Sequence, residues 1–218
     1  LFPGTTLYCD LKEKTGITDD VWLDRIEDIP YYRYDPALSE QLVTRFGKSL
    51  RTGYYRILPS FAESIELQDI KEFYPLHADF CSRLGMTFSH GDYAQIEAIP
   101  EKDKIATKLY EKSLKYYPDH RAFLGLGILK QKSRQYRESI SILSEGIKYF
   151  PESELLHLCL GVGYMNIANF QEAIATFSKL PDSTEAFANI ANCYRALGDK
   201  DNEYRYLKKL ESLSSDKP

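Results

Sequence analysis

The sequence lacks both a long hydrophobic run and an excess of basic charge. Its most apolar stretch, residues 155–162, is interrupted by His157 and is far shorter than the roughly 20 residues that a membrane-spanning helix needs. The formal net charge is -4, whereas dedicated nucleic-acid-binding domains usually carry a strong basic excess. We therefore expect neither a membrane nor a nucleic acid as a partner of this chain.

Cysteine is scarce, and the familiar catalytic motifs are absent. The four cysteines are widely spaced, the nearest two being Cys159 and Cys193, so the sequence contains no local zinc-binding pattern. It also has no G-x-S-x-G, no H-E-x-x-H and no glycine-rich phosphate loop. These absences predict a cytoplasmic protein with reduced cysteines and no catalytic, cofactor-binding or metal-binding residues within this chain.

A repeating pattern of large and small residues occupies the C-terminal two-thirds. Phe123-x-x-Leu126-Gly127 recurs 34 residues later as His157-x-x-Leu160-Gly161. The same spacing occurs at Phe187-x-x-Ile190-Ala191 and, further upstream, at Cys81-x-x-Leu84-Gly85. Because the pattern occurs four times, it indicates a solenoid built from similar units rather than a chance motif.

A second signal follows each small residue at a fixed distance. Ser139 lies twelve residues after Gly127, and Ala173 lies twelve residues after Gly161; each is followed four residues later by a large apolar residue. This pattern resembles the tetratricopeptide repeat, in which W-x₂-L-G-x₂-Y precedes A-x₃-F and a proline. In such a repeat, small residues allow two antiparallel helices to cross closely.

The resemblance covers residues 76–213 and implies an all-α fold. The expected architecture is a right-handed tetratricopeptide-repeat superhelix of about four helix pairs, preceded by an irregular helical leader. We predict helices near 76–89, 104–116, 120–132, 135–148, 153–166, 170–179, 183–197 and 200–212. The expected domains are a leader over 1–75, the solenoid over 76–213 and a frayed tail over 214–218.

The first helix of each repeat lines the concave face in tetratricopeptide domains, so the resemblance places a peptide-binding groove there. We expect this groove to bind a protein or peptide partner or to mediate self-association, whereas the alternative is a purely structural face. The predicted groove residues are Leu124, Ile128, Gln131, Leu158, Val162, Met165, Asn166, Ala188, Asn189, Asn192 and Arg195.

The first 60 residues carry a different resemblance. The run FPGTxLY begins at Phe2, and Arg51-Thr52-Gly53-Tyr54-Tyr55 lies near its end. This segment is similar to the C-terminal tail of cobalamin-binding radical S-adenosylmethionine enzymes, in particular the anaerobic magnesium-protoporphyrin IX monomethyl ester oxidative cyclases. The resemblance implies a parent enzyme containing an iron-sulfur cluster, S-adenosylmethionine and cobalamin, none of which this chain binds itself.

Two hypotheses follow for the whole protein. In the first, the chain is the C-terminal fragment of such an enzyme, because the cluster-binding C-x-x-x-C-x-x-C is missing and Leu1 begins within the motif. In the second, it is a free-standing tetratricopeptide adaptor with residues 1–75 as its leader.

The leader is also expected to contain two helices. Thr5 to Lys14 predicts a short helix stopped at Gly16. A longer helix is expected to start after an Asp35-Pro36 cap and to end at Leu58-Pro59. Four of its apolar residues are expected to face inward, namely Leu42, Val43, Phe46 and Leu50.

Overall fold

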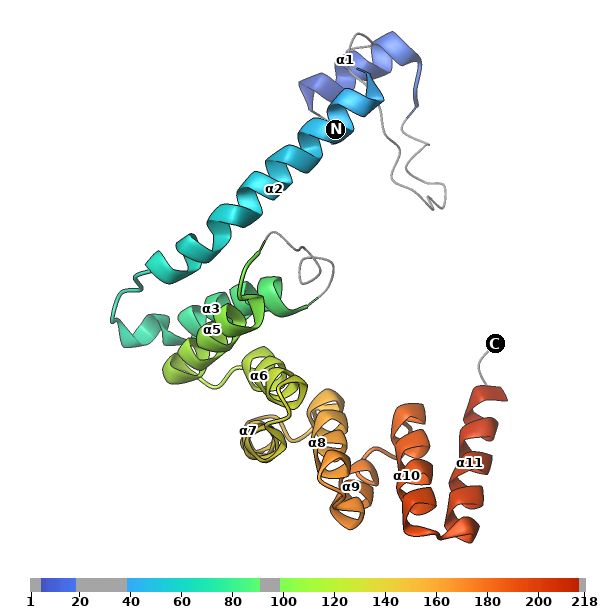
Figure 1. Ribbon diagram of the computed structural model, residues 1–218. Coiled ribbons are helices and arrows are strands. Elements are labelled where there is room, and N and C mark those ends of the chain that lie inside the picture. Colours follow the sequence, from blue (N-terminus) through green and yellow to red (C-terminus); the bar gives the residue numbers. More distant parts are fainter. Residues whose placement is uncertain (1–4, 19–38, 91–98, 216–218) are drawn as a thin grey trace. The chain divides into compact units, whose positions relative to one another are not determined.

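The computed structural model describes residues 5–18, 39–90 and 99–215 of the chain, and every regular element in those ranges is helical (Figure 1). The chain divides into two compact units, Leu1–Tyr54 and Tyr55–Pro218. No helix within the described ranges combines the length and apolar content needed to cross a membrane. The all-α prediction is confirmed for this part of the chain.

Helix α1 (Thr6–Thr15) belongs to the first unit and is capped at both ends. The side chain of Thr5 accepts a hydrogen bond from the backbone N–H of Tyr8, 3.3 Å away. Gly16 ends the helix with φ 71 and donates its N–H to the carbonyl of Lys12. A left-handed residue of this kind is the common way to stop a helix, and the predicted stop at Gly16 is confirmed.

Helix α2 (Glu40–Ser64) is longer than predicted, because it continues through Pro59. The expected Asp35-Pro36 cap lies outside the described residues. An interior proline costs a helix about 3 kcal/mol. The side chains on either side offset that cost, since Leu58 and Ala62 are both buried in one hydrophobic cluster of the second unit. The prediction that the helix ends at Leu58-Pro59 is therefore wrong.

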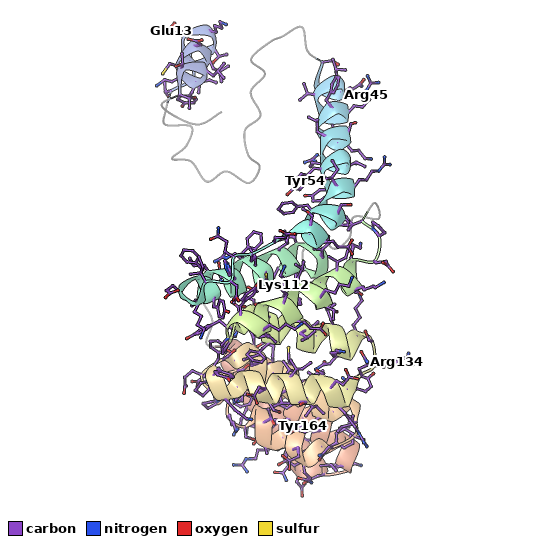
Figure 2. All side chains as sticks on the ribbon, turned by 90° about the vertical axis from the view of Figure 1, so that its left-hand side faces the viewer. Glu13, Arg45, Tyr54, Lys112, Arg134 and Tyr164 are labelled. Atoms are coloured by element: carbon purple, nitrogen blue, oxygen red, sulfur yellow. The ribbon has the colours of Figure 1, made fainter. Side chains whose placement is uncertain are left out.

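The inward orientation predicted for the start of α2 is also partly wrong. Phe46 and Leu50 are 57% and 73% exposed, and Arg45 and Tyr54 are exposed along the same helix (Figure 2). Leu42 and Val43 are half-buried. Periodicity identifies the apolar face of a helix, but it does not identify which turns of that helix meet a hydrophobic core.

The described residues of the second unit form four antiparallel helix pairs in chain order (Figure 1). A short 3₁₀ helix, η2 (Lys71–Phe73), precedes the first pair. The pairs are α3 (Tyr74–Ser89) with α5 (Lys102–Tyr116), α6 (His120–Lys132) with α7 (Tyr136–Tyr149), α8 (Glu154–Asn166) with α9 (Phe170–Phe177), and α10 (Thr184–Leu197) with α11 (Lys200–Ser215). All eight predicted helices are present within a few residues of their expected ends.

Side-chain caps explain why three of the first helices begin where they do. Asp119, Ser153 and Ser183 each accept a hydrogen bond from the backbone N–H three residues later. Each cap satisfies one of the four N–H groups that the first turn of a helix leaves without a partner. The repeats are thus delimited by local chemistry as well as by packing.

The predicted small residues lie where helices cross most closely. A Cβ atom placed on Gly127 would lie 2.5 Å from Cδ2 of Leu143 in α7. The hydroxyl of Ser139 donates to the carbonyl oxygen of Gly127 over 2.9 Å, with both groups buried. The crossing therefore needs a residue without a side chain on one helix, and it is held by a hydrogen bond from a small residue on the other.

Helix α9, the second helix of the third repeat, is the shortest helix of the four pairs. Helix α9 ends at Phe177, ahead of Pro181, yet both Ala173 and Phe177 are fully buried. Removing about one helical turn of 3.6 residues leaves the apolar face in phase. In the first repeat, residues 91–98 between the two helices lie outside the described residues, and α5 begins after Glu101.

Candidate functional site

The eleven predicted groove residues lie on the first helices of three consecutive repeats, α6, α8 and α10. Helix α6 contacts α8, and α8 contacts α10. The three first helices are therefore neighbours in space, although a second helix lies between each two of them in the chain. The predicted groove residues thus fall on the first helices of three successive repeats, as the repeat spacing predicts. Whether a ligand binds to this face stays a prediction.

The apolar members of the set are half-buried and contribute to packing between repeats. Leu158, Val162 and Met165 pack against the cluster that contains Phe187 and Ile190 of α10. Leu124 packs in the same way against the cluster of the preceding repeats. Each side chain therefore joins adjacent repeats while leaving part of its surface accessible to a partner.

Two polar members are already engaged inside the molecule. The amide nitrogen Nε2 of Gln131 donates to the carbonyl oxygen of Cys159 over 2.8 Å, which ties α6 to α8. Arg195 donates through Nε to a carboxylate oxygen of Glu203 over 2.6 Å. Arg195 also donates to the side-chain oxygen of Asn192 over 3.2 Å. Because Glu203 partly neutralises its charge, Arg195 is a weak candidate for holding a ligand carboxylate.

The two remaining asparagines are available to a partner. The side chains of Asn166 and Asn189 form no hydrogen bond with any described residue, and Asn166 is exposed. An asparagine amide offers two donors and one acceptor group, which is the complement that an extended peptide backbone presents. These two residues are the polar groups of the set best suited to bind a peptide.

The histidines have structural partners. His157 is buried, and its Nδ1 donates to the carbonyl oxygen of Ser153 over 2.9 Å. His90 lies 2.6 Å from the hydroxyl of Ser89, and burial lowers the pKa of its imidazole. No group of three or more metal-ligating side chains comes together within the described ranges.

The cysteines are all free thiols. Cys81 and Cys193 are buried, and burial raises the pKa of the Cys193 thiol to about 11. A thiol of that kind behaves as a small apolar side chain. Cys9 in α1 is exposed.

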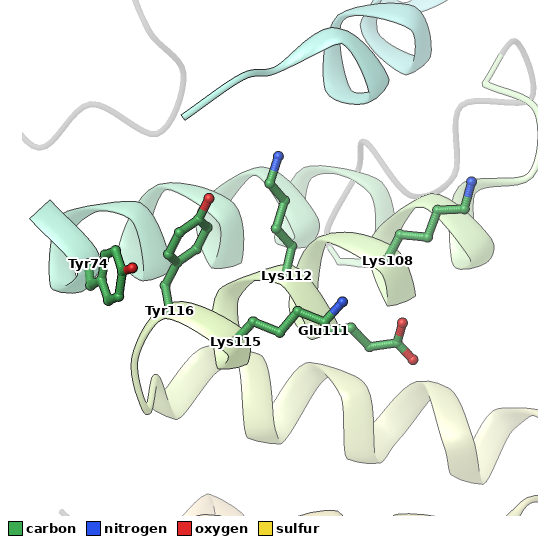
Figure 3. A pocket seen from close by; sticks show the side chains of 6 residues that line it. All are labelled: Tyr74, Lys108, Glu111, Lys112, Lys115 and Tyr116. Atoms are coloured by element: carbon green, nitrogen blue, oxygen red, sulfur yellow. The ribbon is translucent and has the colours of Figure 1, made fainter. Parts of the chain in front are cut away.

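A feature that the sequence analysis did not identify lies on the second helix of the first repeat. A cavity of about 570 Å³ is lined by Tyr74 of α3 and by five residues of α5: Lys108, Glu111, Lys112, Lys115 and Tyr116 (Figure 3). The three lysines occupy positions i, i+4 and i+7, which share one face of a helix. That spacing is visible in the sequence and could have revealed the cluster.

A second cavity, of about 350 Å³, adjoins the first. Lys108 and Lys112 line both cavities, and Ala62, Glu63, Ile105 and Leu109 complete the second. The end of α2 therefore forms one wall of a basic surface whose floor is α5.

Comparison with known proteins identifies structural neighbours but no family. No protein-family model and no curated protein matches the sequence. Among solved structures, one crystal structure of MamA has a TM-score of 0.59 at 18% identity, covering 82% of this chain and 96% of MamA. MamA AMB-1 has a TM-score of 0.55 at 22% identity and covers 77% of this chain and 94% of its own.

The fold is an all-α tetratricopeptide-repeat superhelix. Successive antiparallel helix pairs, small residues at the helix crossings and the similarity to MamA over most of both chains agree on this architecture. Identities this low concern the fold alone. The radical S-adenosylmethionine resemblance of residues 1–60 finds no counterpart among these neighbours.

Proposed function

We propose that this chain is a protein-interaction module that binds an extended peptide segment of a partner along the first helices α6, α8 and α10. The observation that carries the proposal is the row of half-buried apolar side chains on successive first helices, flanked by the unengaged amides of Asn166 and Asn189. Apolar side chains of the peptide would pack on Leu158, Val162 and Met165, and its backbone would be held by the two asparagines.

The chemistry favours a neutral or apolar segment over a carboxylate-terminated one. The only arginine of the predicted set, Arg195, is paired with Glu203, and the other polar members are uncharged. Main-chain hydrogen bonds to asparagine supply affinity with little sequence dependence, whereas the apolar row selects the side chains. Self-association through this face would require that a second copy of the chain supply a neutral or apolar extended segment of the same kind.

Selection from a library of linear peptides displayed on phage, using the full chain as bait, would test the proposal. Peptides enriched in apolar residues are expected. In the double variant Asn166→Ala/Asn189→Ala, the dissociation constant of the best peptide should rise about tenfold or more, since each lost hydrogen bond costs roughly 0.5–1.5 kcal/mol. Gln171→Ala, an exposed amide on α9, is the matched control and should change the constant less than twofold.

Two outcomes would contradict the proposal. One is a selected peptide whose affinity falls equally in Gln171→Ala and in the double variant. The other is the failure of any apolar peptide to bind the folded full chain. If sedimentation shows the chain itself to be a dimer that Asn166→Ala/Asn189→Ala dissociates, the occupant is a second copy rather than a different partner.

We further propose that the module is attached to a cobalamin-dependent radical S-adenosylmethionine enzyme. This proposal rests on the FPGTxLY motif and on Arg51 to Tyr55 alone, and residues 1–4 and 19–38 of the resemblance lie outside the described residues. A C-x-x-x-C-x-x-C encoded within a few hundred codons upstream would support it. A start codon immediately before Leu1 would instead favour a free-standing adaptor.

A further inference from the structure

The cavity on α5 has the composition of a binding site for an anionic ligand. Lys108, Lys112 and Lys115 project from one face of the helix, and the rings of Tyr74 and Tyr116 lie at one end of their row (Figure 3). A volume of about 570 Å³ is within the range of ordinary ligand sites. Three positive charges on one face are unfavourable unless an anion or solvent compensates them.

The walls of this cavity are held in place by the segment that connects α2 to η2. The ammonium group of Lys112 donates to the carbonyl oxygen of Ile65 over 2.9 Å. His77 of α3 donates through Nε2 to the carbonyl oxygen of Gln68 over 3.0 Å. The hydroxyl of Tyr74 donates to the carboxylate of Asp69. Three points of attachment fix this connection against α3 and α5, which lowers the ordering cost of binding.

The aromatic wall is equally constrained. The ring of Tyr116 makes edge-to-face contacts with Tyr74 and with His77, the centroids being 5.2 Å and 5.1 Å apart. Such contacts fix the orientation of a ring at modest energy. The hydroxyl of Tyr116, by contrast, has no hydrogen-bond partner within the described residues. It is therefore free to donate to a ligand.

The charges that remain available define the ligand more closely. Lys115 and Glu111 form no ion pair with a described residue, and Lys108 forms only an exposed contact of 3.5 Å with Glu63. Exposed pairs of that kind are weak, so a ligand carboxylate can replace Glu63. Glu111 and Glu63 border the cavities as well. Their negative charges repel the continuous phosphates of a nucleic acid. Their carboxylate oxygens can, however, accept hydrogen bonds from the N–H groups of a peptide.

The spacing of the lysines fits an extended peptide. Seven residues of α-helix separate Lys108 from Lys115, a rise of about 10.5 Å. Three residues of an extended chain span about 10 Å. We infer that this cavity binds an acidic peptide segment of a protein partner, whose carboxylates, spaced about three residues apart, pair with Lys108 and Lys115, while Tyr116 donates to its backbone. This site is separate from the first-helix face.

Fluorescence anisotropy with a defined probe tests this inference. The probe is fluorescein-labelled Ser-Glu-Ser-Ser-Glu-Ser-Ser-Glu-Ser, and its glutamine analogue is the uncharged control. With the full chain, the acidic probe should bind and the analogue should not. The double variant Lys108→Gln/Lys115→Gln should raise the dissociation constant about tenfold. Lys148→Gln/Lys179→Gln removes the same charge from α7 and from a position two residues beyond the end of α9, and this control should change the dissociation constant less than twofold.

Several results would overturn the inference. Equal weakening by the two double variants would mean that the probe responds to net charge only. If the acidic probe does not bind at about 1 mM protein, the cavity does not bind an acidic peptide and the inference is wrong. Tighter binding of single-stranded oligothymidylate, or competition by inorganic phosphate as effective as by the unlabelled peptide, would assign the site to phosphate. Failure here leaves the first-helix proposal untouched, because Asn166 and Asn189 are unchanged.

Discussion

A Cβ atom on Gly161 would lie 2.4 Å from Cε1 of Phe177. This single relationship joins α8 to α9, and it is the structural reason for the glycine that the repeat pattern places there. Phe177 is fully buried, and its ring cannot move away without displacing the neighbouring cluster. Interiors packed at crystal-like density transmit such a displacement rather than absorbing it.

Gly161→Ala should therefore destabilise the second unit. Overpacking of a buried site costs about 1–3 kcal/mol, which outweighs the gain of roughly 0.5–1 kcal/mol that alanine brings to a helix interior. Urea denaturation followed by circular dichroism measures the change. Gly47→Ala in α2 is the control, since nothing lies within 4 Å of its Cβ position, and it should leave stability unchanged or raise it. Equal effects of the two substitutions would show that the crossing is not tight.

The hydrogen bond between Ser139 and Gly127 should contribute measurably to stability. Ser139→Ala leaves the buried carbonyl of Gly127 without this donor, and such a loss costs about 1 kcal/mol. Ser141→Ala, on the exposed side of the same helix, removes a hydroxyl without a buried partner. The two variants should differ by about 1 kcal/mol in their free energies of unfolding. Identical values would mean that the hydroxyl of Ser139 adds nothing.

How far the sequence predicts the structure depends on the kind of information each element carries. The repeat helices could be predicted because Gly127, Gly161 and their partners twelve and sixteen residues later encode both the helix and its crossing. Helix α2 could not be bounded, since the burial of Leu58 and Ala62 against distant residues outweighs the local effect of Pro59. Tertiary packing commonly overrides propensity in this way.

The candidate sites divide along the same line. The first-helix residues follow from repeat register, so their placement on α6, α8 and α10 could be read from spacing. The hydrogen bonds of these residues inside the molecule could not be predicted, because Glu203, the partner of Arg195, lies on a different helix. The α5 cavity is lined by residues of two helices, α3 and α5. Of its features, only the spacing of the three lysines on α5 is visible in the local sequence. Its tyrosine wall depends on contacts that no local pattern encodes.

Stability should depend on pH through His90. Burial lowers the pKa of this imidazole in the folded chain, so the unfolded chain binds the proton more readily. The contribution of His90 to stability is therefore fully present above the unfolded pKa of about 6.5. It is lost as the pH falls below that value toward the pKa of the folded state. Urea unfolding between about pH 7.5 and 5.5 should show a larger loss for the wild type than for His90→Gln. A smaller loss for the wild type than for His90→Gln would contradict the predicted direction of the contribution of His90 to stability.

The thiols should differ sharply in reactivity. Cys9 is exposed, whereas Cys81 and Cys193 are buried. With a pKa of about 11 for Cys193, only about one molecule in a thousand carries its thiolate at pH 8. Ellman's reagent should label Cys9 rapidly and Cys193 only on unfolding. Cys9→Ser should remove the fast phase, and rapid labelling of Cys193 in that variant would contradict its burial.

The most direct test of the central claim is amide hydrogen exchange of the full chain with and without a saturating apolar peptide from the phage selection. Residues that bind a ligand become protected because opening then requires its release. The account predicts increased protection in α6, α8 and α10, with little change in α5. Protection confined to α5, α7, α9 or α11, or none at saturation, would contradict binding on the first helices.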